Sequence, residues 1–264
     1  MKNRLIQKLE EAKKNKRKLL CVFITLGFPN LKTTEKLIEG FQTKGVDLIE
    51  LGFPFSDPLA DGPTIQFSSE AALKRGVKMR DAFRMVKNLR RKGINIPILF
   101  FSYLNPIFQF GIKRFPSNLK EAGFDGLIIP DCPPEEDEPL WSSCRKADIA
   151  PVFLVAPTTT RKRARKIFAG SRGFLYYVSL RGVTGARKSL PRDLSHNLKA
   201  LHRIDRKPIL IGFGVSTPSQ AKTLSKWASG VIVGSAIVAR IRDSKGKEKP
   251  VLSFVESLAR SLHH

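Results

Sequence analysis

The stretch LLCVFITLGFPNLKTTEKLIEGFQTKGVDLIELG (residues 19–52) holds two short apolar runs joined by a segment with helical periodicity. The runs at 19–26 and 46–52 are dense in Val, Ile, Leu and Phe and do not alternate apolar with polar residues. This pattern is typical of strands buried on both faces of a parallel sheet. The connecting segment suits an amphipathic helix, and Asn30 stands where its N-cap is expected. The stretch therefore predicts a strand, a helix and a second parallel strand.

The same pattern recurs along the rest of the chain. Further apolar runs and helical segments alternate, with the runs at 96–103, 124–130, 150–157, 173–180, 207–214 and 229–236 and the helices at 79–92, 134–147, 160–170, 190–204 and 217–228. Eight strands alternating with helices predict an α/β fold, a (β/α)8 TIM barrel with an N-terminal helix and extra short helices. Because no domain boundary is visible, we expect residues 1–264 to form a single domain.

Composition narrows the class of protein. The chain has 47 Lys and Arg against 23 Asp and Glu, a formal net charge of +24, with 42% hydrophobic residues, which argues against a disordered, collagenous or coiled-coil chain. Its basic runs show little aromatic interleaving and no nucleic-acid motif, so a solvated surface is the default interpretation and specific nucleic-acid binding is not expected. No apolar stretch approaches the length of a membrane span, so we expect a cytoplasmic chain.

Cysteine and histidine usage gives no sign of a disulfide or a metal. The cysteines Cys21, Cys132 and Cys144 are odd in number and irregularly spaced in a chain too large to need disulfides, so we interpret them as free thiols. The four histidines have no partner at metal-ligand spacing. We therefore expect no protein-bound metal.

The first candidate site residue is Glu50. Active sites of such barrels lie at the carboxyl ends of the strands, where polar residues are informative. Counting by two along 46–52 puts Glu50 on the same face as Val46 and Leu48, in poorly solvated surroundings that favour the protonated carboxyl group. The alternative is a structural ion pair between Glu50 and a nearby lysine or arginine.

A second carboxylate is expected from the loop FPFSDPLADGPTIQ (53–66). Its three prolines restrict the backbone, and it carries Asp57 and Asp61. Held near the strand ends, Asp61 could form with Glu50 a pair of carboxyl groups for proton transfer. The alternative is that Asp57 and Asp61 serve only as formers of Asx turns.

Glycine-bearing turns follow the last three predicted strands, namely GVTG (182–185), GFGVS (212–216) and VGSA (233–236). Glycine permits close approach of the backbone, and a helix opening at Ser235 would direct free N–H groups and its positive dipole end at an anion. Many barrels bind a phosphate after strands seven and eight, so we expect a phosphate site here, the alternative being glycines that serve only as turns.

An apolar lining is also expected near the strand ends. These side chains are aromatic or aliphatic and could bind a flat hydrophobic ligand, namely Phe23, Ile65, Phe101, Tyr103, Ile129, Tyr176 and Phe213. The alternative is ordinary filling of the barrel interior. Together with the turns, the lining indicates a ligand with an aromatic body and a phosphorylated tail.

Several of these blocks carry a specific resemblance. The segments ELGFPFSDPLADGPTIQ (50–66), NPIFQFGI (105–112), GLIIPDCPPEE (126–136), VSLRGVTGAR (178–187) and GFGVS (212–216) resemble the tryptophan synthase alpha subunit family, in the family's order and across nearly the whole chain. The resemblance implies a lyase that cleaves indole-3-glycerol phosphate to indole and glyceraldehyde 3-phosphate by a retro-aldol reaction.

The resemblance also implies roles for individual residues. Glu50 matches the general acid/base, Asp61 the carboxylate that hydrogen-bonds the indole N–H, and Tyr176 a tyrosine near the substrate. The phosphate-binding positions of the family match Gly185, Gly214, Gly234 and Ser235. Unusually for the pattern, Arg181, Arg187 and Lys188 make the loop after strand six cationic, which either steers the phosphate or is a set of solvated charges.

Finally, the resemblance implies a partner. No cofactor is expected in this chain, and a beta subunit carrying pyridoxal phosphate would receive indole through a tunnel in an alpha2beta2 heterotetramer. That subunit would dock on the loops around Asp57, 105–112 and 130–136, where Phe110 and Cys132 are either interface contacts or packed loop residues. The alternatives are a stand-alone indole-3-glycerol phosphate lyase that releases free indole and a non-catalytic binding partner.

Overall fold

The computed structural model describes residues 2–178, 193–212 and 214–263, in which parallel strands form one curled sheet. In chain order the strands are β1 (Leu19–Thr25), β2 (Leu48–Gly52), β3 (Ile98–Phe101), β4 (Gly126–Ile128), β5 (Ala150–Pro151), β6 (Leu154–Val155), β7 (Leu175–Val178), β8 (Ile209–Gly212) and β9 (Gly230–Val233). Their order in the sheet is β5-β4-β3-β2-β1-β9-β8-β7-β6. Strands are present at all eight predicted positions.

The run at 150–157 is a broken strand, which accounts for nine strands where eight are predicted. Its first part, β5, pairs with β4, and its second part, β6, pairs with β7. Between these parts, the Val152 N–H donates to the Leu127 carbonyl, and the Phe153 carbonyl accepts from the Tyr176 N–H, both at 3.0 Å. One short segment thus hydrogen-bonds to both ends of the sheet and closes it into a barrel.

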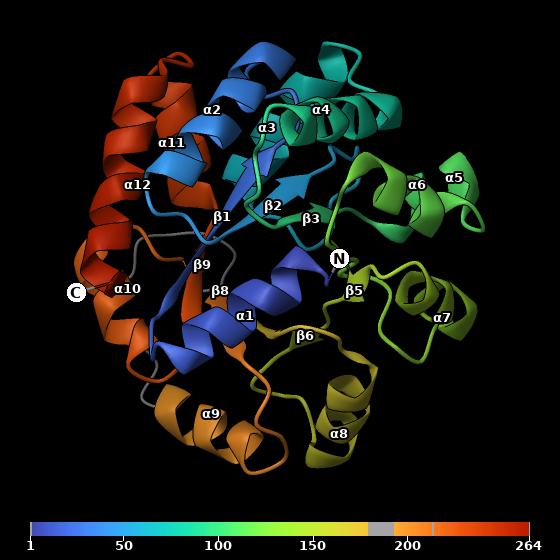
Figure 1. Ribbon diagram of the computed structural model, residues 1–264, viewed down its shortest axis with the longest axis vertical. Helices are drawn as coiled ribbons and strands as arrows, with labels where there is room; N and C mark the ends of the chain where they lie inside the picture. The colour runs from blue at the N-terminus through green and yellow to red at the C-terminus, as the bar shows by residue number, and fades with distance from the viewer. Residues whose placement is uncertain (1, 179–192, 213, 264) are drawn as a thin grey trace.

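Helices surround the strands (Figure 1). They are α1 (Arg4–Lys14), α2 (Leu31–Thr43), α3 (Pro63–Lys74), α4 (Met79–Arg91), α5 (Leu104–Gly111), α6 (Phe115–Ala122), α7 (Glu138–Lys146), α8 (Arg161–Gly170), α9 (Leu194–His202), α10 (Pro218–Ser225), α11 (Ser235–Asp243) and α12 (Glu248–His263). The predicted Asn30 cap is confirmed, since its side chain accepts from the Thr33 N–H at 2.8 Å. The helix predicted from residue 134 begins at Glu138, because the Asp137 side chain caps it there.

The barrel interior forms its own apolar cluster, distinct from the larger layer between sheet and helices. Its strand residues alternate along the chain, as Leu19 and Cys21 do on β1. Leu5 and Leu9 of α1 join this cluster, and Figure 1 shows α1 lying across the middle of the ring of strands. Helix α1 therefore closes the end of the barrel at which the strands begin.

Polar contacts hold α1 at that end. The Asn3 side-chain amide donates to the backbone carbonyls of Asp125 and Asp148, at 2.8 and 2.7 Å. The buried Asp125 carboxylate accepts from the guanidinium groups of Arg4 and Arg90, each at 2.8 Å. Because α1 covers the amino-terminal ends of the strands, the carboxyl-terminal ends are left for a ligand site. None of the helices in the described part of the chain is long and apolar enough to cross a membrane.

Candidate active site

Glu50 projects into the barrel interior from β2. It lies two residues after Leu48, which belongs to the interior cluster, and its side chain is completely buried. Val46 precedes the strand and packs in the outer layer instead. Burial raises the pKa of the Glu50 carboxyl group to about 8, so the expectation of a mainly protonated group at neutral pH is confirmed. Within the described residues Glu50 forms no ion pair, against the alternative of a structural salt bridge.

The two oxygens of Glu50 have different surroundings. Oε1 accepts a hydrogen bond from the Cys21 thiol of β1, with Sγ 3.6 Å away, while the buried Oε2 has no partner among the described groups. A buried carboxyl oxygen without a partner is costly unless a ligand or water supplies one. The thiol thus orients the carboxyl group and leaves Oε2 available to a ligand.

We expect removal of the thiol to raise the pKa of Glu50 further. The hydrogen bond from Cys21 lowers that pKa and so opposes the larger effect of burial. In Cys21→Ala the midpoint of the Glu50 titration should move upward by about half a pH unit, the size expected for loss of a weak hydrogen bond. This midpoint is measured by following the NMR signal of the Glu50 side-chain carboxyl carbon as a function of pH. Cys144→Ala, which removes a buried thiol of α7 far from Glu50 in sequence, should leave the midpoint in place; an unshifted midpoint in Cys21→Ala would contradict the role of the thiol.

Asp61 is held near the barrel mouth by Tyr103. The Tyr103 side chain hydrogen-bonds the Asp61 carboxyl group, and its hydroxyl oxygen accepts from the Ala60 N–H at 2.9 Å. Burial raises the pKa of Asp61 to about 6, which leaves it mostly ionised at neutral pH. Asp57 is exposed and hydrogen-bonds the neighbouring Ser56 hydroxyl at 2.5 Å. The two aspartates of the loop therefore have different surroundings, and only Asp61 faces a buried tyrosine.

The hydroxyl group of Tyr176, on β7, is affected by the charges of both Glu50 and Asp61. Burial raises the pKa of its hydroxyl well above the usual value, and the charges of Glu50, Cys21 and Asp61 add to that shift in this order. Its phenol group therefore lies close enough to both carboxyl groups to sense their charge. Strands β1, β2 and β7 and the loop before α3 thus converge on one partly dehydrated site.

Two glycines make room for aromatic rings in the mouth. A Cβ atom on Gly52 would lie 2.4 Å from Phe23, and one on Gly212 would lie 2.3 Å from Tyr176. Phe23 meets the edge of Phe101 with 5.4 Å between the ring centroids. Phe23 and Phe101 are therefore in contact, and Tyr176, like Phe101, packs against the interior cluster. Ile65 lies buried in the first turn of α3, just after Asp61.

Ile129 is placed differently from the prediction. Strand β4 puts Ile128 in the interior cluster and the next residue, Ile129, in the outer layer between sheet and helices. Because successive side chains of a strand point to opposite faces, an error of one residue reverses the side. Ile128, not Ile129, contributes to the interior. Gly185 and Phe213, together with Arg181, Arg187 and Lys188, lie outside the described residues.

The start of α11 has the features of an anion site. Gly234 is its N-cap and supplies no side-chain cap, while Ser235 is the first helical residue. The first N–H groups of such a helix need an acceptor, and the dipole favours a negative one. Gly214, after β8, has φ of +55°, a conformation that suits glycine. Both turns follow neighbouring strands, since β8 pairs with β9.

Exposed apolar side chains lie outside the barrel mouth. Leu59, two residues before Asp61, is 93% exposed, and Phe108 of α5 is 63% exposed. Phe110 instead packs against Phe83 and Phe115, and Cys132 is completely buried. Phe110, which lies in α5 rather than in a loop, and Cys132 therefore both pack within the chain.

Sequence reasoning missed two functional neighbours. The sequence predicts Cys21 only as a free thiol; it is free, and it also donates to Glu50. The sequence predicts Tyr103 as pocket lining, whereas in the structure it is the partner of Asp61. The available signals were the position of Cys21 two residues before Phe23 on the interior face and that of Tyr103 just after β3. Among the described side chains no cluster of His, Cys, Asp and Glu could hold a metal ion.

Comparison with known proteins decides the family. The family model described as tryptophan synthase alpha chain matches residues 9–264. This chain belongs to the tryptophan synthase alpha chain family. The alpha chain of Geotalea daltonii is 46% identical over 235 residues, 89% of each chain, and that of a Thermoanaerobacter species is 44% identical over 259 residues, 97% of this chain and 98% of the other.

Solved structures agree with this family membership. A chain of Mycobacterium tuberculosis tryptophan synthase has a TM-score of 0.92 at 31% identity, with both chains fully covered. The tryptophan synthase subunit alpha of Legionella pneumophila has a TM-score of 0.92 at 33% identity over 99% of both chains. The TIM barrel and the assignment to tryptophan biosynthesis are therefore confirmed, and the chain is a carbon-carbon lyase.

Proposed function

We propose that this chain cleaves indole-3-glycerol phosphate with Glu50 as the proton carrier and Asp61 as its electrostatic partner. One observation carries the assignment. Glu50 is completely buried beside Tyr176, with Oε2 lacking a partner and the pKa of the carboxyl group raised to about 8. A carboxylic acid that is protonated at neutral pH and has one oxygen without a hydrogen-bond partner is suited to general acid and then general base catalysis.

The two parts of the substrate are assigned to different parts of the barrel mouth. The phosphate group is assigned to the start of α11, at Gly234 and Ser235, and to the turn at Gly214 after β8. The resemblance adds Gly185, which lies outside the described residues. The indole ring is assigned to the space bordered by Phe23 and Phe101, with Ile65 and Ile128 completing the lining. The resemblance adds Phe213, which lies outside the described residues. The chemistry of the two regions supports this orientation, since glycines and the helix dipole suit the anion and the aromatic rings suit indole.

The reaction then needs two proton movements. Glu50 gives its proton to C3 of the indole ring, and the positive charge that develops on the ring nitrogen is stabilised by the ionised Asp61. Glu50, now a carboxylate, takes the proton of the hydroxyl group next to the bond to be broken. As the C–C bond breaks, its electron pair restores the aromatic ring, and the hydroxyl carbon becomes the aldehyde of glyceraldehyde 3-phosphate. Glu50 is protonated again, so the cycle needs no cofactor of this chain.

This assignment predicts a bell-shaped pH dependence of kcat/KM. Activity requires Glu50 protonated, which is lost as the pH rises through about 8, and Asp61 ionised, which is lost as the pH falls through about 6. The optimum should lie between these values, with apparent pKa values that belong to the coupled pair. Initial rates of indole formation from pH 5 to 9 measure it; a rate independent of pH across that range would contradict the protonation states assigned here.

The partner is proposed to be a beta subunit that carries pyridoxal phosphate, in an alpha2beta2 complex located in the cytoplasm. Support comes from the exposed apolar side chains of Leu59, in the loop before α3, and of Phe108, in α5, which are suited to burial in an interface. Leu59 belongs to the same loop as Asp61, so a partner docked there could order the catalytic carboxylate.

The test is indole release from indole-3-glycerol phosphate by the purified chain, with and without added beta subunit. Strong stimulation is expected if docking orders the loop around Asp61. High activity of the chain alone would instead support a stand-alone lyase that releases free indole. Absence of indole under both conditions would refute the proposed function and leave a non-catalytic binding partner.

A further inference from the structure

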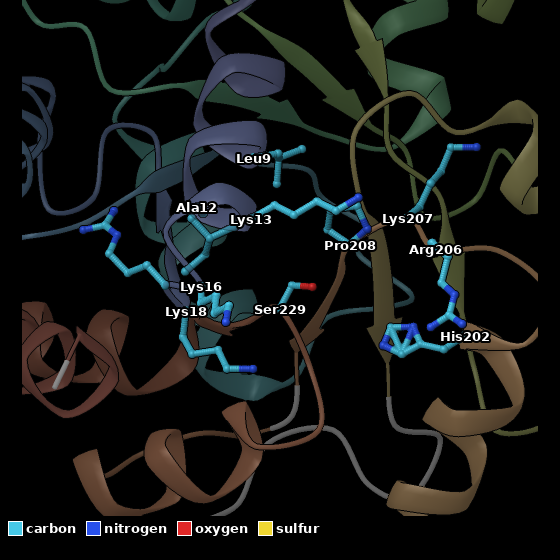
Figure 2. A pocket seen from close by; sticks show the side chains of 12 residues that line it. Leu9, Ala12, Lys13, Lys16, Lys18, His202, Arg206, Lys207, Pro208 and Ser229 are labelled. Atoms are coloured by element: carbon cyan, nitrogen blue, oxygen red, sulfur yellow. The ribbon is translucent and has the colours of Figure 1, made fainter.

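A cavity of about 430 Å³ lies at the end of the barrel opposite the candidate active site (Figure 2). It opens between the end of α1 and the segment that leads from α9 into β8. Its apolar surface comes from Leu9, Ala12, Leu19 and Pro208, and Ser229 adds a hydroxyl group between them. The residues Leu19, Pro208 and Ser229 lie at the amino-terminal ends of β1, β8 and β9, which are neighbours in the sheet.

The side chains around this cavity are strongly cationic. Half of its twelve lining residues are basic and none is acidic, the basic ones being Lys13, Lys16, Arg17, Lys18, Arg206 and Lys207. They come from two segments nearly 190 residues apart in sequence, brought together by the pairing of β1 with β9 and of β9 with β8. Lysines at the end of α1 are favourable toward the helix dipole, but that effect does not account for the cations of the second segment.

Three of these cations lack a counter-charge. Arg17 pairs with Asp47 and Lys207 with Asp205, and the Lys18 ammonium group donates to the Ala228 carbonyl at 2.7 Å. Many other lysines and arginines in the described parts of the chain form ion pairs. No such pair is formed there by Lys13, Lys16 or Arg206. An anion in the cavity would meet all three.

Two side chains that line the cavity, His202 and Lys18, have lowered pKa values. The pKa of His202 is lowered by burial and further by repulsion from Arg206, and burial lowers the pKa of Lys18. The His202 Nδ1 atom is buried and has no hydrogen-bond partner among the described groups. Positive charges gathered around one cavity repel one another, and a bound anion would relieve that repulsion.

We propose that this cavity is a binding site for a small anion that carries a di- or triphosphate chain. Its volume is larger than a single phosphate needs and lies within the usual range for small-molecule sites. Several flexible cations, among them the forked guanidinium group of Arg206, match the several charged oxygens of such a chain, and the Ser229 hydroxyl can donate to one more. The apolar surface can bear an attached organic body.

The site is independent of the candidate active site because the barrel interior lies between them. Calorimetric titration of the full chain with inorganic triphosphate, with ATP and with inorganic phosphate in about 0.15 M salt, where the screening length is about 8 Å, tests it. We expect one saturable site per chain for the two triphosphates and much weaker binding of phosphate. Equal affinity for ATP and triphosphate would place recognition in the phosphate chain, and tighter binding of ATP would show that the apolar surface contributes.

A charge-matched pair of variants makes the test specific. Lys13→Gln/Lys16→Gln/Arg206→Gln removes the three unpaired cations and should weaken triphosphate binding by at least about tenfold, with unchanged indole release in the absence of the anion. Arg161→Gln/Lys162→Gln/Lys166→Gln removes three exposed cations of α8 and should bind as the wild type does. Equal weakening in both variants, several sites per chain, or no saturable binding would overturn the proposal.

Discussion

Glu50→Gln is expected to reduce the turnover of indole-3-glycerol phosphate by at least about 1,000-fold, as befits loss of a general acid/base. Glutamine matches the size of the side chain and can still occupy the space beside Cys21, but it has no proton to give to the indole ring and cannot accept one afterwards. The loss should appear in kcat rather than in KM, because the phosphate and indole contacts remain.

The loss of turnover in Glu50→Gln should not arise from unfolding of the variant. The folded-state pKa of Glu50, about 8, is raised above the usual value of 4.5, so its ionisation opposes folding. Wild-type stability contributed by this group is fully present below about pH 4.5 and is lost as the pH rises toward 8. Glu50→Gln removes that loss and should be at least as stable as the wild type at pH 8 in urea unfolding.

A matched control is Glu70→Gln on α3, where the carboxylate is exposed and pairs with Lys74. That variant should keep wild-type turnover, since exposed pairs of this kind contribute little. Wild-type turnover in Glu50→Gln, measured as indole released per chain, would refute the assignment of Glu50 as the proton carrier.

Asp61→Asn is expected to reduce kcat by about 100-fold or more, the usual effect of removing one electrostatic stabiliser of a transition state. The amide keeps the shape of the side chain and can still accept a hydrogen bond from Tyr103, but it lacks the negative charge that opposes the positive charge on the indole nitrogen. The loss should be milder than for Glu50→Gln, because the proton carrier remains.

The same loop supplies the control for this prediction. Asp57→Asn changes an exposed carboxylate four residues earlier, in contact with Ser56, and should have little effect on kcat. Tyr103→Phe removes the hydroxyl group that holds Asp61 and Ala60, so we expect an intermediate loss. Near-normal turnover in Asp61→Asn would exclude a catalytic role for its charge.

Much of the architecture follows from local sequence. Unbroken apolar runs can bury both faces only inside a parallel sheet covered by helices, so the strand positions, including β1 and β2, are predictable from composition and period. The sequence also predicts which side chains of β2 face the barrel interior, because Leu48 and the polar Glu50 share one face. It does not predict this for β4, since Ile128 and Ile129 are both apolar and nothing in the run distinguishes the two faces.

Sequence alone determined that a carboxyl group, Glu50, would stand at the carboxyl end of an interior strand face, that a proline-rich loop would bring a second carboxylate, and that glycines would follow the last strands. Tertiary structure decided which groups meet. The lateral register of β1 against β2 brings the Cys21 thiol to Glu50, and packing of the loop against the residue after β3 joins Tyr103 to Asp61. Barrel closure also gathers the cations of α1 and of the segment before β8 around one cavity. These contacts depend on register and closure, which are set by the cooperative packing of the whole barrel and leave no local signature in the sequence.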